Sequence, residues 1–218
     1  MSKPLSVFSP VPGVSGLWSA QKGGLRCTAL KLRDGTLCLY SPVLGLTDTV
    51  RESLQVLGEV AFLLAPNHYH NKGVAEYAGA YPKARLVCTD KARPRLEKQT
   101  GHKFQGLDRL QALLPDNCTF VEPEGLKTGE IWFELAGEAT RAWVVTDTFK
   151  GPTGPVGTVS ERIELLGTFP KFGIQDKMSY MSWLEERLAA FQPLLVVPCH
   201  GSLVLSETLV RDIMLLQD

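Results

Sequence analysis

Two histidines one residue apart, His68 and His70, directly follow an apolar run in the segment "LLAPNHYHNKG" at positions 63–73. In an extended segment, residues i and i+2 face the same way, so both imidazoles can reach one metal ion. Neutral imidazole is a common ligand of zinc and iron. The alternative interpretation is that both side chains only supply hydrogen bonds within a loop.

Two further apolar runs end at residues that can bind a metal. "RAWVVT" leads into Asp147, and "LLVVPC" leads into His200. Loops at strand ends carry the chemistry of many α/β folds, because the sheet holds the base of each loop. We therefore expect His68, His70, Asp147 and His200 to share one zinc or iron ion. Alternatively, Asp147 caps a turn and His200 only begins a loop.

The elements that must position these residues follow from the apolar pattern. Short β-branched runs alternate with amphipathic stretches, which predicts an α/β or layered α+β fold. "LRCTALKLRDGTLCLYSP" predicts a hairpin, because Asp34-Gly35 suits the positive φ angles of a tight turn. Six more runs are short enough for buried strands: "VAFLLAP", "ARLVCTD", "CTFVEP", "EIWFELAG", "RAWVVTD" and "LLVVPCHG".

Helices are expected between these strands. "TVRESLQVLG" has Thr49 and Glu52 at capping-box spacing and Gly58 as a stop. Further helical patterns lie near residues 73–80, 91–99 and 182–191, and "SETLVRDIMLLQ" predicts a last helix with Ser206 as its N-cap. The segment "FKGPTGPVGTVSERIELLG" is too long for an ordinary connection, so we expect a lid over the site or an ordered surface excursion.

The bulk composition limits the class of partner. The chain has 218 residues, 44% of them hydrophobic, which favours a single domain over residues 1–218. Its 23 basic and 23 acidic residues balance, so neither nucleic acid nor a membrane is expected as a partner, and a small molecule is. No signal-peptide or membrane-spanning run is found, so we expect a cytoplasmic location. The oligomeric state is left open.

The five cysteines are odd in number and never form a C-x-x-C pair. This pattern is typical of buried, reduced thiols and argues against a disulfide framework or a zinc knuckle. Neighbouring residues of an extended segment point to opposite sides. If His200 faces an ion, Cys199 is therefore expected to face the packed interior.

With these segments in place, the sequence resembles the metallo-β-lactamase fold superfamily over nearly its whole length. "RCTALKLRDGTLCLYSPV" is similar to the opening hairpin, and "APNHYHNKGVAEYAGAYPKARLV" to the first metal motif with its helix and next strand. "VVTDTF" resembles the bridging-aspartate segment and "VPCHGS" the last-histidine segment. The resemblance implies an αββα sandwich with zinc- or iron-dependent hydrolysis at the edge of two sheets. A minority of such proteins are oxidoreductases.

The match to the superfamily's motifs is partial. The usual first motif is His-x-His-x-Asp-His, but here Lys72 stands at the Asp position and Gly73 at the following His position. The segment expected to supply a third histidine, "EPEGLKTGE", has none. Asp147 and His200 fit their motifs. The resemblance therefore implies one ion rather than two.

Two functions are compatible with this pattern. The first is a metal-dependent hydrolase of a small ester, thioester, lactone or phosphodiester, in which Asp147 is catalytic and a metal-activated water attacks the substrate. The second is a catalytically inactive binding protein of the same fold. In either case the Lys72 ammonium is expected to bind an anionic group of the substrate or the Asp147 carboxylate. The alternative for Lys72 is a solvated position at the start of the next helix.

Overall fold

Two mixed six-stranded sheets form the centre of the computed structural model, which describes residues 4–137 and 140–216. The first sheet is antiparallel from its first to its fourth strand and then parallel. In spatial order its strands are β1 (Ser9–Pro10), β2 (Leu17–Lys22), β3 (Leu25–Lys31), β4 (Leu37–Tyr40), β5 (Val60–Leu64) and β6 (Arg85–Val87).

The second sheet contains the remaining long strands of the chain. Its spatial order is β11 (Val159–Ser160), β14 (Leu203–Leu205), β13 (Leu195–Pro198), β9 (Arg141–Val145), β8 (Trp132–Ala136) and β7 (Cys118–Val121). Strands β9 and β13 are parallel neighbours, so their carboxyl ends lie at the same edge. A separate antiparallel pair is formed by β10 (Phe149–Lys150) and β12 (Glu164–Leu165).

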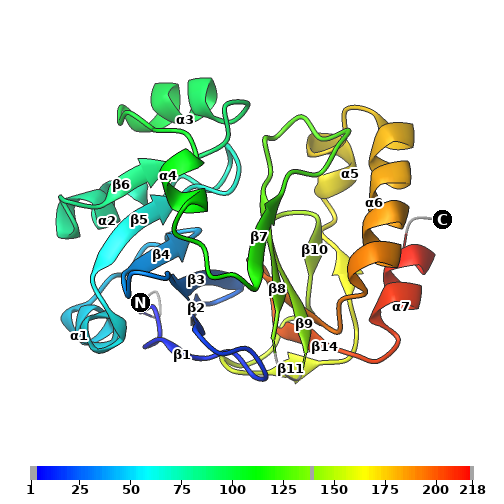
Figure 1. Cartoon of the computed structure of the whole chain (residues 1–218), viewed down its shortest axis with the longest axis horizontal. Helices are drawn as coiled ribbons and strands as arrows, with labels where there is room; N and C mark the ends of the chain where they lie inside the picture. Colours follow the sequence, from blue (N-terminus) through cyan, green and yellow to red (C-terminus); the bar gives the residue numbers. More distant parts are fainter. Residues whose placement is uncertain (1–3, 138–139, 217–218) are drawn as a thin grey trace.

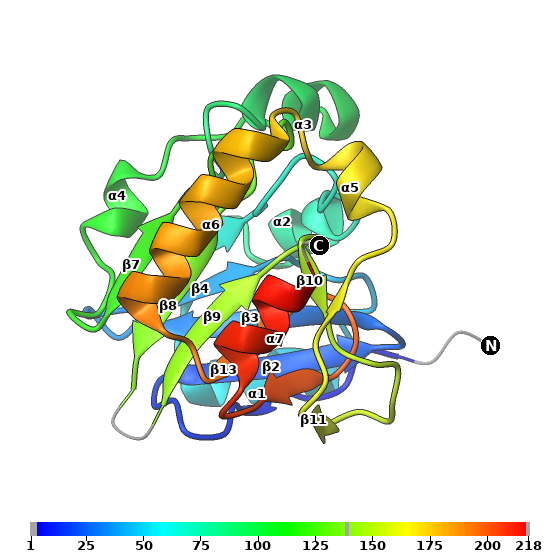
Figure 2. The same ribbon diagram turned by 90° about the vertical axis from the view of Figure 1, so that its right-hand side faces the viewer.

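Helices flank both sheets (Figure 1). They are α1 (Asp48–Leu57), α2 (Val74–Ala80), α3 (Arg93–Thr100), α4 (Asp108–Gln111), α5 (Phe169–Phe172), α6 (Lys177–Phe191) and α7 (Leu209–Leu215). Figure 2 shows α6 and α7 lying across the outer face of the second sheet. The order of layers is therefore the predicted αββα sandwich. Across the described residues, none of these helices has the length and apolarity needed to cross a membrane.

Alternation along the strands explains why two layers of core form. In β9, Ala142 and Val144 pack between the two sheets, whereas Trp143 and Val145 pack under α6 and α7. In β4, Tyr40 likewise faces the other sheet while Leu39 faces α1. Because successive side chains of a strand point to opposite faces, a strand that is apolar at every position is buried on both sides.

The predicted strands are confirmed. The hairpin turns at Gly35, which has a φ of 84°, and all six predicted strand runs contain a strand. The register of the hairpin pairs Lys31 with Leu37 across this turn. The short apolar runs of the sequence are therefore the strands of the two sheets.

The predicted helices are present, but three of them begin at other residues. Helix α1 is capped two residues before the proposed Thr49, because the Thr47 side chain accepts the backbone N–H of Val50. Helix α6 begins after its cap Asp176, several residues before the predicted range. Helix α7 begins after Thr208 rather than after Ser206.

The long segment after β9 is ordered rather than a bare loop. It contains the short strands β10, β11 and β12, and β11 extends the second sheet by pairing with β14. Ile163 from this segment is buried in the core under α6. Both features match the ordered surface excursion more closely than a free lid.

Tyr40 links the two sheets beside the strand ends that carry the candidate site. Its hydroxyl donates to the carbonyl of Ile131 at 2.7 Å and lies 2.6 Å from the hydroxyl oxygen of Thr146. The side chain is fully buried, so water cannot replace these partners. The hydroxyl therefore ties the end of β4 to the end of β9.

We expect Tyr40→Phe to lower the free energy of unfolding by about 1–2 kcal/mol, because it leaves a buried carbonyl and a buried hydroxyl without a partner. Urea unfolding followed by tryptophan fluorescence measures this change. Tyr81→Phe is the matched control, since the buried Tyr81 hydroxyl has no hydrogen-bond partner among the described residues. Equal effects of the two substitutions would contradict the assigned role of Tyr40.

Candidate metal centre

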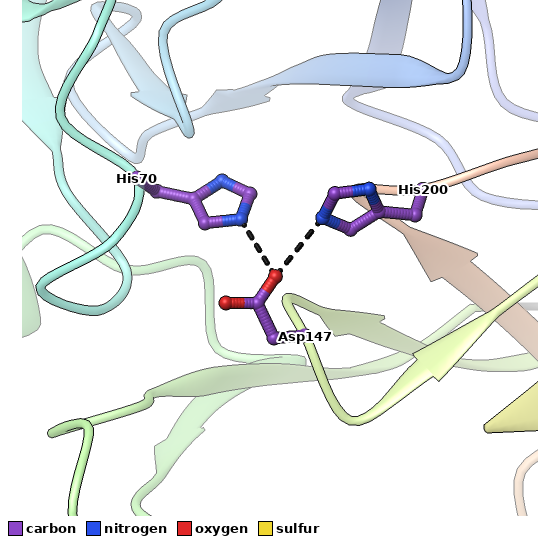
Figure 3. Close-up of side chains that lie close together, drawn as sticks. All are labelled: His70, Asp147 and His200. Atoms are coloured by element: carbon purple, nitrogen blue, oxygen red, sulfur yellow. Dashed lines mark hydrogen bonds and ion pairs between the residues drawn. The ribbon is translucent and has the colours of Figure 1, made fainter. Parts of the chain in front are cut away.

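Three of the four predicted ligands come together at one edge of the sandwich. The Nε2 atoms of His70 and His200 each lie 2.9 Å from Oδ1 of Asp147 (Figure 3). One ligand atom from each of these residues lies within 4.8 Å of the other two. The imidazole rings are nearly perpendicular, with centroids 5.4 Å apart. This group could hold a metal ion with two nitrogens and one oxygen.

The topology explains why these distant residues meet. His70 follows β5 of the first sheet, and Asp147 and His200 follow β9 and β13 of the second. Strands β9 and β13 are parallel and pair in register up to Val145 and Pro198. Asp147 and His200 each follow two residues later, so both lie at the same edge of the sheet. The site therefore lies at strand ends from both sheets, as the sequence predicts.

Asp147 is the residue on which the group converges. Besides the two imidazoles, its Oδ2 accepts a hydrogen bond from the Asn67 amide at 2.7 Å. Burial by itself raises the pKa of this carboxyl, but the charge of His70 and the hydrogen bonds from His200, His70 and Asn67 outweigh it. The net result is a pKa well below the usual value, so the carboxylate is ionised at neutral pH.

His70 is held from both ring nitrogens. Its Nδ1 lies 2.6 Å from the Ser41 hydroxyl oxygen, which can act as donor or acceptor and therefore accommodates either tautomer. Burial lowers the pKa of His70, but the adjacent Asp147 carboxylate outweighs burial and raises the pKa well above its usual value. Binding of a metal ion here would therefore release the proton of His70, because a ligating imidazole is neutral.

Glu130 supports the loop that carries Asp147. Its buried Oε1 accepts hydrogen bonds from the backbone N–H groups of Asp147 and Thr148, at 3.3 and 3.4 Å, and from the Trp132 indole at 2.7 Å. Burial, together with repulsion from the Asp147 carboxylate, raises the pKa of Glu130 to about 7. Glu130 comes from the segment that lacks the expected third histidine, and it positions the Asp147 loop rather than joining the group.

A buried arginine fixes the loop that carries His200. The Arg26 guanidinium donates to the carbonyls of Pro198 and Gly201, at 3.1 and 2.9 Å, and to the Ser19 hydroxyl at 2.9 Å. Burial lowers the pKa of Arg26 to about 10, which still leaves it charged at neutral pH. The hairpin of the first sheet therefore holds the chain directly around His200.

The backbone beyond His200 also requires a glycine. Gly201 has a φ of 77°, a conformation that residues with a side chain rarely adopt. A Cβ at this position would lie 2.0 Å from the carbonyl oxygen of Gly151. The close approach of these two backbone segments therefore depends on the absence of a side chain at position 201.

His68 does not join the group, which corrects the predicted set of four ligands to three. The segment after β5 is a turn rather than an extended chain, because Asn67 Oδ1 accepts the backbone N–H groups of Tyr69 and His70. Residues i and i+2 then face different ways. The His68 Nε2 instead lies 3.2 Å from Nη1 of Arg95. Burial and the Arg95 charge lower the pKa of His68 to about 4, so its ring is neutral.

Lys72 lies at the protein surface and Cys199 in the interior. Lys72 is exposed and lines a cavity beside the group, but its ammonium makes no hydrogen bond or ion pair with any described residue, Asp147 included. Its role in substrate binding stays a prediction. Cys199 is buried in the core between the sheets, as predicted.

The cavity beside the group has a volume of about 860 Å³, which is within the range of small-molecule sites. His70, Asp147 and His200 all line it. Leu166 is the residue of the long segment 149–167 that reaches it within the described chain. The three candidate ligands are therefore accessible to a molecule bound in this cavity.

Three further residues of the site were not singled out in the sequence: Asn67, Ser41 and Arg26. Asn67 had a recognisable signal, since asparagine after a strand often forms a turn through its own side chain. Ser41 and Arg26 had none, because their partners His70 and Gly201 are distant in the chain.

We expect His70→Gln and His200→Gln each to weaken zinc binding about 100-fold or more, because each removes one of three ligands. His68→Gln should change zinc affinity by less than about threefold, because His68 contacts Arg95 instead. Competition with a fluorescent zinc chelator measures all three affinities. A loss in His68→Gln as large as in His70→Gln would restore the four-ligand set.

The fold is found in solved structures of very different sequence, although no protein-family model and no curated protein matches the chain. The Flv1 flavodiiron core from Synechocystis sp. PCC6803 has a TM-score of 0.67 and 12% identity; the match covers 100% of this chain, which spans 61% of the length of that one. A metallo-β-lactamase from Hirschia baltica has a TM-score of 0.63 and 11% identity, covering 99% of this chain and 98% of its own. The metallo-β-lactamase FIM-1 from Pseudomonas aeruginosa, in the mono-zinc form, has a TM-score of 0.64 and 11% identity, and the match covers 99% of this chain and 96% of that one. The chain therefore has the metallo-β-lactamase fold that its sequence resembles.

Proposed function

We propose that this protein is a hydrolase that uses one metal ion, held by His70, Asp147 and His200, to cleave a small ester, thioester, lactone or phosphodiester. The observation that carries the proposal is the convergence of two imidazoles on one ionised, buried carboxylate at the wall of a cavity of small-molecule size. A zinc or iron ion bound there would activate a water molecule as a nucleophile and polarise a carbonyl or phosphoryl group.

The surrounding residues are arranged to hold such a ligand set. Asn67 occupies Oδ2 of Asp147, which leaves Oδ1 directed at the two imidazoles. Ser41 fixes the ring of His70 from its far nitrogen, the kind of outer contact that orients metal-ligating histidines. His200 is the most accessible of the three side chains at 23% exposure, so substrate can approach from its side. In this proposal Asp147 is catalytic because it binds the ion.

Zinc and iron both suit this donor set. Two imidazoles and one carboxylate are found at zinc hydrolase sites and at non-haem iron sites. The similar structures point the same way, since FIM-1 is in a mono-zinc form and Flv1 is described as a flavodiiron core. A single ion is proposed because the described residues contain one group of side chains, these three, that could hold a metal.

The second candidate function is binding without catalysis, and one observation favours it. His68 interacts with an arginine, and Lys72 and Gly73 stand where the resemblance implies two further ligands. A scaffold in which only His70 of this first motif joins the ligand group can keep its cavity as a binding site. Fold alone does not separate the two functions, because one fold serves many activities.

Elemental analysis of protein purified without added metal, followed by turnover assays on p-nitrophenyl acetate, a thioester, a lactone and bis-p-nitrophenyl phosphate, tests the proposal. We expect close to one zinc or iron per chain and hydrolysis of at least one substrate. Asp147→Asn should lower kcat/KM about 100-fold or more, because it replaces a charged ligand with a neutral amide.

Asp116→Asn is the matched control, since the Asp116 side chain is 92% exposed at the surface. It should leave metal content and turnover unchanged. Metal-free protein that turns over none of the four substrates would support the binding protein instead. Turnover that survives both chelation and Asp147→Asn would refute a metal-dependent mechanism.

A further inference from the structure

The cavity beside the metal-ligand group has an unbalanced charge. Three cations line it from separate parts of the chain: Lys22 at the end of β2, Lys72 before α2, and Arg95 in α3. Asp147 is the one acidic residue among the described residues that line the cavity, and its carboxylate is already occupied by two imidazoles and an amide. The remaining positive charge therefore has no counterpart in the described cavity wall.

Arg95 is the most firmly oriented of these cations. Its Nη1 lies 3.2 Å from Nε2 of His68, and its guanidinium carbon lies 4.5 Å from the centroid of the Tyr69 ring. Neither contact neutralises the charge: the imidazole is a hydrogen-bond acceptor and the ring makes a cation–π contact. Among the described residues no carboxylate pairs with Arg95, and its side chain is exposed, so a ligand can reach it.

Arginine is well suited to recognise an oxyanion. Its planar guanidinium presents paired N–H groups that match the two oxygens of a carboxylate or phosphate. One nitrogen of Arg95 is engaged by His68, which fixes the plane of the group and leaves other N–H groups available. A donor that is already oriented loses less entropy when a ligand binds.

Two further features of the cavity point to a ligand with both polar and apolar parts. The side chains of Leu25, Leu44, Tyr69 and Phe172 line it and are between 36% and 46% exposed, which is unusual for large apolar groups gathered in one place. Thr128 also lines it, and its buried hydroxyl has no hydrogen-bond partner among the described residues. Buried hydroxyls normally have a partner, so a ligand atom is a natural one.

We propose that this cavity binds a small amphipathic anion, with its carboxylate or phosphate on Arg95 and its apolar body against Leu44 and Phe172. Lys22 and Lys72 add to the positive field at the same cavity. The inference rests on the proposed function in placing the scissile bond of such a ligand at the three metal ligands. The anion site itself can be tested without turnover.

Isothermal titration calorimetry of the full chain with octanoate, octyl phosphate and neutral octanamide provides the test. The protein is first treated with a chelator that is then removed, so that an anion cannot bind through a metal ion. We expect octanoate or octyl phosphate to bind about tenfold more tightly than octanamide, and the difference to shrink as salt is added. The preference between the two anions identifies the head group.

Arg95→Gln should lower the affinity for the anion about tenfold, which removes most of this preference, and should leave octanamide binding unchanged. Arg95→Lys should keep part of it, because the charge remains but the paired donors are lost. Lys98→Gln, an exposed change on the same helix, is the control and should have no effect. Circular dichroism melting shows whether each variant is folded.

Equal binding of octanoate and octanamide, no binding of either anion, or an unchanged preference in folded Arg95→Gln would each overturn the proposal. If Arg95→Gln fails to fold, two measurements decide. One compares the anions with octanamide on the native protein, and the other makes the same comparison on Arg95→Lys. Anion binding by a protein that hydrolyses none of the substrates in the turnover assays would refute the proposed function and leave the anion site intact. Hydrolysis in those assays without a preference for the anions would refute the anion site and leave the proposed function intact.

Discussion

The buried carboxylate of Asp147 lies where strand ends from both sheets meet, and its negative charge needs hydrogen-bond donors at that place. Three donors provide this, from two segments: Asn67 and His70 after β5, and His200 after β13. Burying a carboxylate without such partners costs several kcal/mol. The position of each loop therefore depends on the others. Glu130 and Arg26 then hold the backbone of the Asp147 and His200 loops from behind.

The turn at Asn67 gives His68 and His70, which are one residue apart, different contacts. His70 turns toward Asp147, whereas His68 turns toward Arg95 on α3. His70 is thus part of the group that could hold a metal ion, and His68 orients the positively charged guanidinium of Arg95. The cavity that His70 and Arg95 line combines a group that could hold a metal ion with cationic side chains. This combination suits a ligand that has a reactive bond near one end and an anionic group at the other.

The likeness to metallo-β-lactamase structures explains the architecture but leaves the chemistry to the local residues. At 10–11% identity, two sheets and their helices are retained while most side chains differ. What this chain retains at the strand ends is a group of three candidate ligands, and the surrounding cavity wall carries the cations Lys72 and Arg95. In the proposed function, activity and specificity depend on these residues more than on the fold, because one fold serves many activities.

The sequence by itself determined the strands, because apolar periodicity is local, whereas the αββα order of the layers followed from the resemblance to a known family. It also placed the three candidate ligands together, because strand ends at one sheet edge lie near one another. Helix starts such as the cap at Thr47 were less well predicted, since several neighbouring residues can cap. Only the tertiary structure decided which way each histidine points. The prediction treats the chain from His68 to His70 as extended, but the Asn67 side chain makes it a turn, so the two side chains face different ways. Partners such as Ser41 and Arg26 are distant in the sequence and have no periodic signal, so only packing brings them to the site. Local patterns can place a residue at a strand end, but its orientation depends on contacts formed across the whole chain.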